Sequence, residues 1–479
     1  MLATTDSMVA AIVEEVLQRL QPQLASPASV RQAAGGDFGV FPTVDKAVKA
    51  ARAAQKVLAT RSLEERGEVI EIIRRLSFER AEELGRMEFE ESQLGRLDHK
   101  IEKLRLVKKV LGVEALKTEA RSDTSGVCLI EYAPFGVIAM VSPSTHGVPT
   151  MGGNAINVIA GGNTAVFSSH PATARSVAYA VRLFNQEIEK KTGLRDLLTT
   201  VESPSIESAN ELFRHRDIAL ICVTGGAAVV AAAMQSGKRV VAAGPGNPPV
   251  LVDETADLNK AAEAIIAGAS FDNNLLCISE KEVFVVSKVA DEFVAAMKRA
   301  GASQLNHAQI EKLTQTVFTF EDGTDGGRGR AHVKHEFVGK DPAVLASAIG
   351  VRLAPETPLL FGETDENHAF VQTEQLMPFL PVVRVACVDE GIRAALKAEH
   401  GYRHTAIIHS RNAENVTKMA RALNTTMFIQ NAPCFASLGS GGPGYLSWSI
   451  ATPTGEGVTT PLTFTRQRQL TMAGALRII

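Results

Sequence analysis

Hydrophobic and polar residues alternate with two different periods along the chain. Beyond residue 135, short runs rich in valine, isoleucine and threonine alternate with alanine-rich runs of helical period. Such alternation predicts parallel strands joined by helices in a doubly wound α/β sheet. The predicted strands of this first series span residues 136–141, 164–167, 197–201, 218–223 and 239–243.

A second series of the same kind begins near residue 250. It contains strand-like runs at 282–286 and 380–385 and a helix-like run at 288–300. Helical spacing dominates between residues 43 and 119, whereas the segment after residue 455 lacks it and is expected to form an extended arm. The sequence therefore predicts two α/β domains and an arm.

The first 20 residues form a separate pattern. Apolar residues recur there at helical spacing with charged and amide side chains between them, which predicts a short amphipathic helix. Residues 21–36 are rich in Ala, Ser, Pro and Gly and are expected to form a flexible linker. The apolar stripe of this tethered helix needs a partner surface, and its members are Val9, Ile12, Val13, Val16, Leu17 and Leu20.

The composition is that of an ordinary globular protein. The chain has 479 residues, and 50 Lys and Arg residues stand against 53 Asp and Glu residues, for a formal net charge of −3. Because there is no basic excess, nucleic acid is not an expected partner. No uncharged apolar run approaches the roughly 20 residues of a membrane-spanning helix, and no secretory signal is recognisable. The five cysteines lie far apart without a CxxC pair, which favours a reducing, cytoplasmic compartment over a disulfide framework.

Cys277 is the strongest candidate nucleophile. It lies in FDNNLLCISEKEVFVV, between a helix-like run and a strand, with Asn273 and Asn274 supplying turn chemistry just upstream. A thiol in such a polar junction is expected to ionise more easily and to be more accessible than Cys222, which lies in the apolar run IALICVTG. The alternative is a packed core cysteine at a domain boundary.

Two glycine-rich segments are candidates for cradling a phosphate group. Thr224-Gly225-Gly226 ends a predicted strand and begins an alanine-rich helix, so backbone amides and the helix dipole could face a diphosphate there. Residues 439–444 fit the spacing GxGxxG, but Pro443 interrupts them and no helix follows, which favours a loop where backbones approach closely. The 11 histidines show no metal-ligand spacing, and no metal is predicted.

Five segments together resemble the aldehyde dehydrogenase superfamily, specifically its CoA-acylating branch from bacterial microcompartments, the propionaldehyde and acetaldehyde dehydrogenases. In chain order they are EYAPFGVIAMVSPSTHGVPT, AGGNTAVFSSHP, TGGAAVV, FDNNLLCISEKEVFV and EQLMPFLPVVRV. The similarity extends from about residue 39 to the C-terminus. It implies an aldehyde dehydrogenase-like α/β fold and an NAD-dependent oxidation that transfers the acyl group to coenzyme A.

The resemblance also assigns roles to individual residues. It implies that Cys277 is the nucleophile, that Thr224, Gly225 and Gly226 line the dinucleotide site, and that Glu374 contacts the nicotinamide ribose. These assignments divide the chain into an NAD-binding domain (37–247), a catalytic domain (248–454) and a C-terminal oligomerisation arm (455–479).

Two histidines receive roles of their own from the resemblance. The family usually has an asparagine, whose amide helps to hold the oxyanion, where this chain has His146. A neutral imidazole can donate one hydrogen bond, so His146 could replace that amide, with the Cys277 backbone N–H as a second donor. His170, in SSHP, is expected to contact the adenosine part of NAD or CoA.

The acyl acceptor is predicted from a missing carboxylate. Hydrolytic members of the superfamily have a glutamate, the base that activates water, in the segment that matches RVVAAGPGNPPVLV, and this chain has Ala243 there. No glutamate occurs between Gln235 and Val252. A thiolate is a strong nucleophile that needs less assistance than water, which favours CoA. The alternatives are a hydrolytic, carboxylate-forming dehydrogenase and a non-catalytic compartment scaffold of the same fold.

The resemblance finally implies partners. The helix at residues 1–20 resembles targeting extensions of this branch, so a microcompartment shell protein is its expected partner, with an oligomer-packing helix as the alternative. A homo-oligomer, dimer or tetramer, is expected, with residues 119–132 and the C-terminal arm as interface strands. The expected localisation is the cytoplasm, inside a microcompartment.

Overall fold

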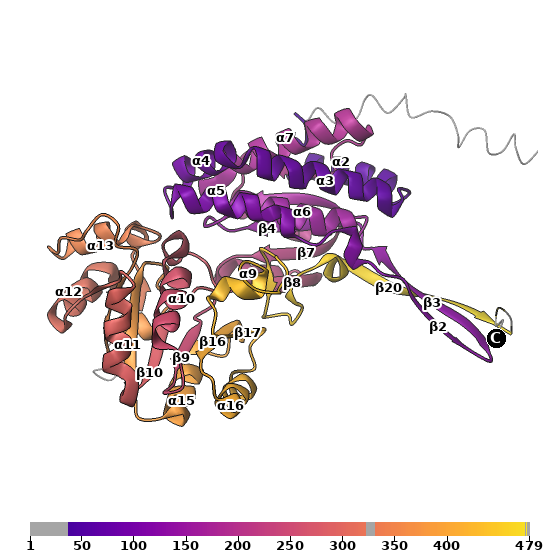
Figure 1. Ribbon diagram of the computed structural model, residues 1–479. Helices are drawn as coiled ribbons and strands as arrows, with labels where there is room; N and C mark the ends of the chain where they lie inside the picture. Colours follow the sequence, from indigo (N-terminus) through magenta and orange to yellow (C-terminus); the bar gives the residue numbers. More distant parts are fainter. Residues whose placement is uncertain (1–36, 322–330, 475, 477–479) are drawn as a thin grey trace, which may run out of the picture. The chain divides into compact units, whose positions relative to one another are not determined.

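The computed structural model describes residues 37–321, 331–474 and 476. These residues form two large parallel β-sheets flanked by helices, a three-stranded antiparallel sheet and two small two-stranded sheets (Figure 1). The prediction of an α/β fold with parallel sheets is confirmed. The helix expected at residues 1–20 and the linker expected at 21–36 lie outside the described residues. None of the helices in the described part of the chain is long and apolar enough to cross a membrane.

The first sheet has six parallel strands, and all five strands predicted from the first series belong to it. Its central strand β4 begins the series, β5 and β6 follow on one side, and β7 and β8 follow on the other. In sheet order the strands are β1 (Val40–Phe41), β6 (Leu198–Val201), β5 (Thr164–Ser169), β4 (Val137–Ser142), β7 (Ile218–Thr224) and β8 (Arg239–Ala243).

The strand order of this sheet reverses between β4 and β7. In doubly wound sheets, ligands bind outside the carboxyl ends of the strands at such a reversal. The residues that follow β4 include His146, and the residues at the end of β7 include Thr224 and Gly225. The topology therefore brings two of the segments singled out from the sequence to the same edge of one sheet.

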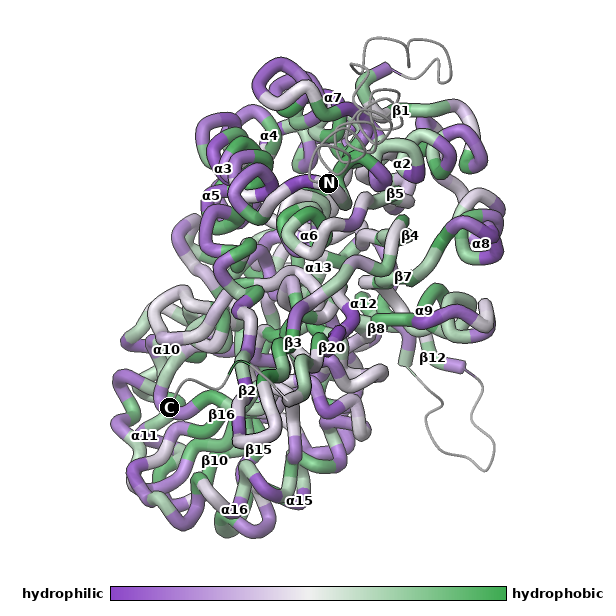
Figure 2. Tube along the Cα trace, turned by 90° about the vertical axis from the view of Figure 1, so that its right-hand side faces the viewer, coloured by the Kyte–Doolittle hydropathy of each residue, from purple (hydrophilic) through white to green (hydrophobic). Residues whose placement is uncertain are grey.

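The helices around the first sheet differ in burial according to their composition. Helix α6 is mostly apolar, with Thr150, Asn154 and Asn157 as its polar residues, and all of its residues are buried. A helix that is hydrophobic all round belongs inside the protein, and Figure 2 shows α6 as mainly hydrophobic and α4 as mainly hydrophilic. The helices are α2 (Val44–Leu58), α3 (Leu63–Glu79), α4 (Ala81–Ser92), α5 (Leu97–Leu106), α6 (Gly147–Ala160), α7 (Ala174–Thr192), α8 (Ile206–Arg214) and α9 (Ala227–Met234).

The second sheet has seven parallel strands. In sheet order they are β11 (Ser303–Gln304), β14 (Leu360–Glu363), β15 (Phe379–Val385), β10 (Glu282–Val286), β9 (Pro249–Val252), β16 (Thr405–His409) and β17 (Met427–Gln430). The main helices of this part are α10 (Leu258–Ser270), α11 (Ser287–Arg299), α12 (His307–Val317), α13 (Pro342–Ala348), α15 (Val388–Glu399) and α16 (Ala413–Leu423). The central strands are fully buried, as expected of a parallel sheet covered on both faces.

The third sheet joins strands from distant parts of the chain. Strands β2 (Glu119–Asp123) and β3 (Gly126–Pro134) form a hairpin, and β20 (Thr465–Ala473) pairs with β3 along its whole length. Figure 1 shows the yellow β20 beside the purple hairpin. Most side chains of β2 and β20 are exposed, which fits the extended arm expected after residue 455.

Candidate active site

Cys277 follows a turn with an unusual backbone. Asp272, Asn273 and Asn274 have φ values of 50°, 55° and 66°, so three consecutive non-glycine residues adopt the left-handed conformation. Asp and Asn tolerate this conformation best among residues with a Cβ, yet each such residue still costs on the order of 1 kcal/mol. The two asparagines had been singled out as turn residues, and the structure confirms this role.

Buried side-chain hydrogen bonds hold this turn in place. Asn273 Nδ2 donates to the Gly339 carbonyl at 3.0 Å and to Asp341 at 2.8 Å. Asn274 Nδ2 donates to the carbonyls of Ala269 and Glu280, both at 2.9 Å. The fully buried Lys281 closes the far side, because its Nζ donates to Asn274 O at 2.7 Å and to Asn274 Oδ1 at 2.5 Å.

Cys277 is a partly buried residue, and its thiol does not ionise easily. Burial, followed by the Glu374 carboxylate, raises the pKa of Cys277 to about 12. Lys281 and the backbone N–H groups of Cys277 and Ile278 act in the opposite direction. The expectation that the polar sequence context of Cys277 would ease ionisation relative to Cys222 is therefore wrong for this structure, because burial also raises the pKa of Cys222 to about 12.

Gly246 connects the β8–β9 loop to the nucleophile. A Cβ at this position would lie 2.5 Å from the Cys277 carbonyl oxygen, so only glycine allows the two backbones to approach this closely. The Gly246 N–H also donates a long hydrogen bond of 3.5 Å to Glu374 Oε1. Burial raises the pKa of Glu374, while Lys281 and the Gly246 N–H lower it. The structure thus brings Cys277 and Glu374 together, whereas Ala243 ends β8 without a carboxylate.

His146 lies at the N-terminus of α6 with its side chain buried. Its Nδ1 is 2.7 Å from the Thr145 hydroxyl, and its ring lies 5.8 Å from the ring of Trp448. Burial and the charges of Lys103 and Lys100 hold the pKa of His146 well below its usual value, so the imidazole is neutral. When Nδ1 accepts from Thr145, the proton resides on Nε2, which is then the donor that an oxyanion requires.

A small apolar cavity of about 50 Å³ lies beside the nucleophile. The residues on both sides of Cys277, Leu276 and Ile278, line it together with Trp448, Phe435 and Leu438. The volume accommodates only a few non-hydrogen atoms. Neither Cys277 nor His146 lines the cavity itself, but Trp448 lines it and also packs against the His146 ring.

Thr224, Gly225 and Gly226 connect β7 to α9 as the sequence suggested. Gly226 is the N-cap residue of α9, no side chain caps this helix, and a Cβ on Gly226 would meet nothing within 4 Å. The Thr224 hydroxyl is 2.7 Å from that of Ser449, beside Trp448. The free helix N-terminus and the open space at Gly226 suit a diphosphate group.

His170 follows β5, and its N–H donates to the Ser142 carbonyl at the end of β4. It is exposed at the N-cap of the short helix Pro171–Thr173, where its Nδ1 accepts the Ala172 N–H at 3.1 Å. No hydrogen bond or ring contact of the described residues joins it to Cys277 or His146. The glycine-rich segment 439–444 forms a tight loop, since a Cβ on Gly444 would lie 1.6 Å from the Ser437 carbonyl oxygen, as expected of a backbone-approach loop.

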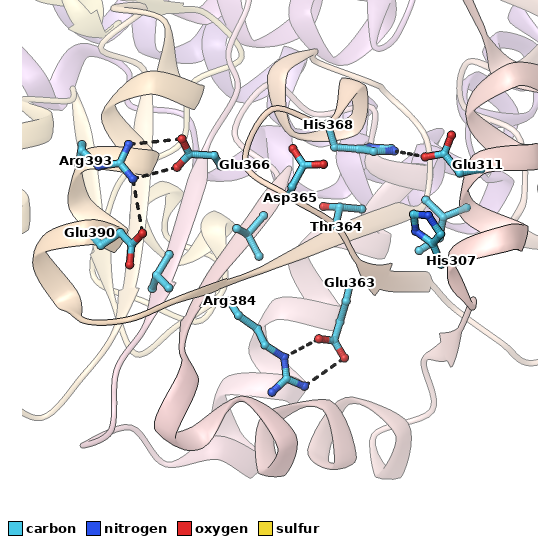
Figure 3. A pocket seen from close by; sticks show the side chains of 13 residues that line it. His307, Glu311, Glu363, Thr364, Asp365, Glu366, His368, Arg384, Glu390 and Arg393 are labelled. Atoms are coloured by element: carbon cyan, nitrogen blue, oxygen red, sulfur yellow. Dashed lines mark hydrogen bonds and ion pairs between the residues drawn. The ribbon is translucent and has the colours of Figure 1, made fainter.

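A larger pocket of about 610 Å³ lies at the carboxyl ends of β14 and β15 and contains none of the predicted site residues. Two of its carboxylates pair with arginines, Glu363 with Arg384 at 2.5 Å and Glu366 with Arg393 at 3.0 Å (Figure 3). Glu311, Asp365 and Glu390 also line it. Among the residues that the structure describes, no group of three or more His, Cys, Asp or Glu side chains is placed to hold a metal ion.

Several residues around Cys277 could not be found from the sequence. Lys281 stands in the charged run SEKEV, which usually indicates a solvated surface, yet its side chain is fully buried. Trp448 and Phe435 line the cavity from a segment without a recognisable motif. Only the three-dimensional contacts assign these residues to the site.

Comparisons with known proteins agree with this geometry. A model described as "Aldehyde dehydrogenase family" matches residues 25–316. The chain is 44% identical over 470 residues to the acetaldehyde dehydrogenase (acetylating) EutE of Salmonella typhimurium. The aligned region covers 98% of each protein.

Solved structures extend the comparison. A propionaldehyde dehydrogenase from the Clostridium phytofermentans fucose utilisation bacterial microcompartment is 40% identical, with a TM-score of 0.88 over 92% of this chain and 100% of that chain. A Rhodopseudomonas palustris propionaldehyde dehydrogenase with bound CoA and an acylated cysteine gives the same identity, TM-score and coverage. An engineered glycolyl-CoA reductase with bound NADP+ is also 40% identical, with a TM-score of 0.88 over 93% of this chain and 100% of that chain. The expected fold is therefore confirmed.

Proposed function

This chain belongs to the aldehyde dehydrogenase family, and from that premise we propose that it oxidises a short aldehyde with NAD(P) and transfers the acyl group to coenzyme A. The observation that carries the proposal is the environment of Cys277. The partly buried Cys277 lies in the chain between two residues that line an apolar cavity large enough for only a few atoms. That arrangement suits a nucleophile acting on a small, uncharged carbonyl compound.

The first half-reaction forms a thioester on Cys277. The thiolate adds to the aldehyde carbon, and the resulting oxyanion is held by the backbone N–H of Cys277 and by Nε2–H of the neutral His146. A bound nicotinamide dinucleotide supplies the hydride acceptor. The thiol proton passes to solvent as the thiolate forms. The C–H bond of the adduct then breaks with its electron pair leaving as hydride, and the C=O bond re-forms to give the thioester on sulfur.

The second half-reaction releases the acyl group to a thiol. The loop after β8 begins at Ala243 and approaches the Cys277 carbonyl through Gly246. None of the residues of this loop has a carboxylate side chain. Water is therefore poorly activated there. The CoA thiolate attacks the acyl carbon, and Cys277 leaves as thiolate, so no net oxidation or reduction occurs in this step. The CoA-bound, acylated cysteine of the Rhodopseudomonas palustris relative supports this order of events.

We place the dinucleotide site at the turn that connects β7 to α9. The exposed N-cap Gly226 and the uncapped first turn of α9 would bind a diphosphate with Gly225 beside them. We assign Glu374 to the nicotinamide ribose, since its carboxylate acts on Cys277 and so lies where the reacting end of the cofactor must arrive. We assign the exposed His170 to the adenosine part of the cofactor or of CoA.

A coupled assay tests this function. Propionaldehyde, acetaldehyde, NAD, NADP and CoA are combined in turn, and NADH or NADPH, acyl-CoA and free carboxylate are measured. We expect reduced cofactor and acyl-CoA in equal amounts, and their complete loss in Cys277→Ala. Cys387→Ala, at an exposed cysteine, is the matched control and should keep parent activity.

Rapid aldehyde oxidation to carboxylate without CoA would instead favour the hydrolytic reaction. One observation makes this a real alternative, because Glu374 is a carboxylate that acts on Cys277 and could activate water. Activity in Cys277→Ala within tenfold of the parent would remove the proposed nucleophile altogether.

Partners are proposed on the same basis. The sheet of β2, β3 and β20, whose outer strands β2 and β20 are mostly exposed, is the proposed contact between copies of the chain in a dimer or tetramer. Residues 1–20 are the proposed docking segment for a microcompartment shell protein, supported by the compartment origin of the Clostridium phytofermentans relative. Deleting residues 1–20 should preserve activity and oligomer size while abolishing co-localisation with shells. Dissociation into inactive subunits would place this helix in the oligomer instead.

A further inference from the structure

Four charged side chains form a buried cluster beneath the active site. Lys100 and Lys103 of α5, Glu88 of α4 and Asp272 of the left-handed turn are all at most 1% exposed. Lys103 pairs with Asp272, and Lys100 pairs with Glu88 at 3.1 Å and with Asp272 at 3.8 Å. Two positive and two negative charges balance, which is the condition under which ions are tolerated away from water.

The cluster contacts the segment that positions His146. The Thr145 carbonyl accepts hydrogen bonds from Lys100 Nζ and, at 3.2 Å, from Lys103 Nζ. On the other side of His146, the Val148 N–H donates to Glu88 Oε2 at 2.8 Å. The backbone on both sides of the imidazole is therefore held by charged side chains from α4 and α5.

The same cluster contacts the segment that positions Cys277. Asp272 receives Lys103 on one oxygen and the Arg96 N–H on the other at 2.8 Å, and its own N–H donates to His99 Nδ1 at 2.7 Å. Asp272 is the first left-handed residue of the turn that leads to the thiol. Lys103 therefore hydrogen-bonds both segments directly, and Lys100 contacts the same two groups, with its Nζ 3.8 Å from the Asp272 carboxylate.

We infer that Lys103 is a positioning residue for the reaction: it fixes the oxyanion donor His146 relative to the nucleophile Cys277 by bridging the Thr145 carbonyl and the Asp272 carboxylate. This inference rests on the proposed function, in which His146 donates to the oxyanion. The donor lies at the carboxyl end of the first sheet, and the thiol precedes the second sheet. The backbone of neither segment fixes the distance between His146 and Cys277. The Lys103 side chain, which joins the Thr145 carbonyl to the Asp272 carboxylate, does fix it.

The charges of the cluster also serve the protonation state that the donor needs. Burial is the main cause that lowers the pKa of His146, and Lys103 and Lys100 lower it further while Asp272 raises it, so the neutral ring keeps one nitrogen free to donate. Apolar side chains packed at the same place could hold the backbone, but they would not lower the pKa of His146 as the two lysines do. The two lysines thus act on both the place and the charge state of the imidazole.

A double-mutant cycle separates positioning from mere stabilisation. The turnover number and KM for propionaldehyde are measured with saturating cofactor and CoA in the parent, Lys103→Met, His146→Ala and the variant with both changes. We expect Lys103→Met to lower kcat by at least about 30-fold with KM within about threefold, since one oxyanion donor is worth roughly 10²-fold. The double variant should be within about threefold of His146→Ala, because both changes remove one interaction. Lys108→Met, at an exposed lysine on the same segment, should match the parent.

Other outcomes overturn the inference. If the two losses multiply, or if Lys103→Met stays within about threefold of the parent, Lys103 does not act through His146. Should Lys103→Met fail to fold, Lys103→Met combined with Asp272→Asn removes one charge of each sign and takes its place in the cycle. If that variant is also unfolded by circular dichroism, the cluster is structural only and the inference is wrong. A parent enzyme that forms no acyl-CoA contradicts the proposed function itself.

Discussion

The Glu374 carboxylate raises the pKa of the Cys277 thiol, although the two residues come from different loops. Burial of the thiol acts in the same direction, and Lys281 opposes both. With a pKa of about 12, the thiol is almost entirely protonated near neutral pH in the absence of ligands. A protonated thiol reacts more slowly with oxidants and alkylating agents than a thiolate does.

Neutralising Glu374 should make this thiol more reactive. In Glu374→Gln the negative charge is lost, so the pKa of Cys277 falls and the thiolate fraction at a given pH rises. The measurement is the rate of alkylation by iodoacetamide between pH 7 and 10, followed by mass spectrometry of the Cys277 peptide. We expect a several-fold faster reaction than in the parent at pH 8.

Lys281→Met should change the reactivity of the Cys277 thiol in the opposite direction. Removing its positive charge should raise the pKa of Cys277 further and slow alkylation. If both variants changed the rate in the same direction, the electrostatic account of the thiol would be wrong. Alkylation of the exposed Cys387 in the same samples serves as the internal control.

His146→Ala should lower the rate of hydride transfer by roughly 10²-fold, the usual cost of losing one oxyanion donor. His146→Asn should retain most of the activity, because an amide N–H can occupy the position of Nε2–H. Single-turnover formation of NADH, measured by stopped flow, isolates this step. An unchanged rate in His146→Ala would show that the imidazole does not face the reacting oxygen.

Enlarging the cavity beside Cys277 should change the preferred aldehyde. Phe435→Ala removes a side chain from the cavity wall, so longer aldehydes such as hexanal should gain relative to propionaldehyde. We expect the ratio of the two kcat/KM values to shift by at least about tenfold, the scale of one or more buried methylenes. Phe78→Ala, at an exposed phenylalanine of α3, is the control. Equal ratios in the parent and Phe435→Ala would place the acyl chain elsewhere.

Acid should destabilise the protein through its buried histidines. Burial lowers the pKa of His409, which is 2% exposed, to about 4, against 6.5 for an ordinary histidine. A group with a depressed pKa stabilises the folded state above its unfolded pKa, and this contribution is lost as the pH falls from about 6.5 to 4. The full loss is on the order of 3 kcal/mol, since one pKa unit equals about 1.4 kcal/mol.

His409→Leu should make the decline of Tm over this pH range shallower, as measured by differential scanning calorimetry. His307→Leu, at an exposed histidine, should leave the decline unchanged. A parallel shift of both curves without a change in slope would contradict a role for His409 titration. His404, whose pKa burial also lowers to about 4, should sustain part of the decline in either variant.

The elements of the fold were predictable where the pattern is local. The predicted strand at 282–286 has the bounds of β10, and the one at 239–243 has the bounds of β8, because valine-rich runs between polar residues specify buried strands directly. The pairing of β20 with β3 was not predictable in register, since its partners are far apart in the sequence and mostly exposed.

The site was predictable only in part for the same physical reason. Asn273 and Asn274 indicated a turn because their side chains favour left-handed backbone, and the structure has that turn. The ionisation of Cys277 was misjudged, because it depends on the burial of the thiol and on Glu374, neither of which neighbouring residues reveal. Lys103 lies at helical spacing in a charged segment, where nothing indicates that its ammonium group reaches Asp272.

The left-handed turn before Cys277 also limits how this enzyme can vary. If codons 272–274 are randomised together and the library is selected for acyl-CoA formation, we expect the active variants to have only asparagine, aspartate or glycine at these positions. At position 272 we expect aspartate alone, since glycine and asparagine would remove the carboxylate that pairs with Lys103. Directed evolution towards new aldehydes is therefore best aimed at the cavity wall, leaving these three codons fixed.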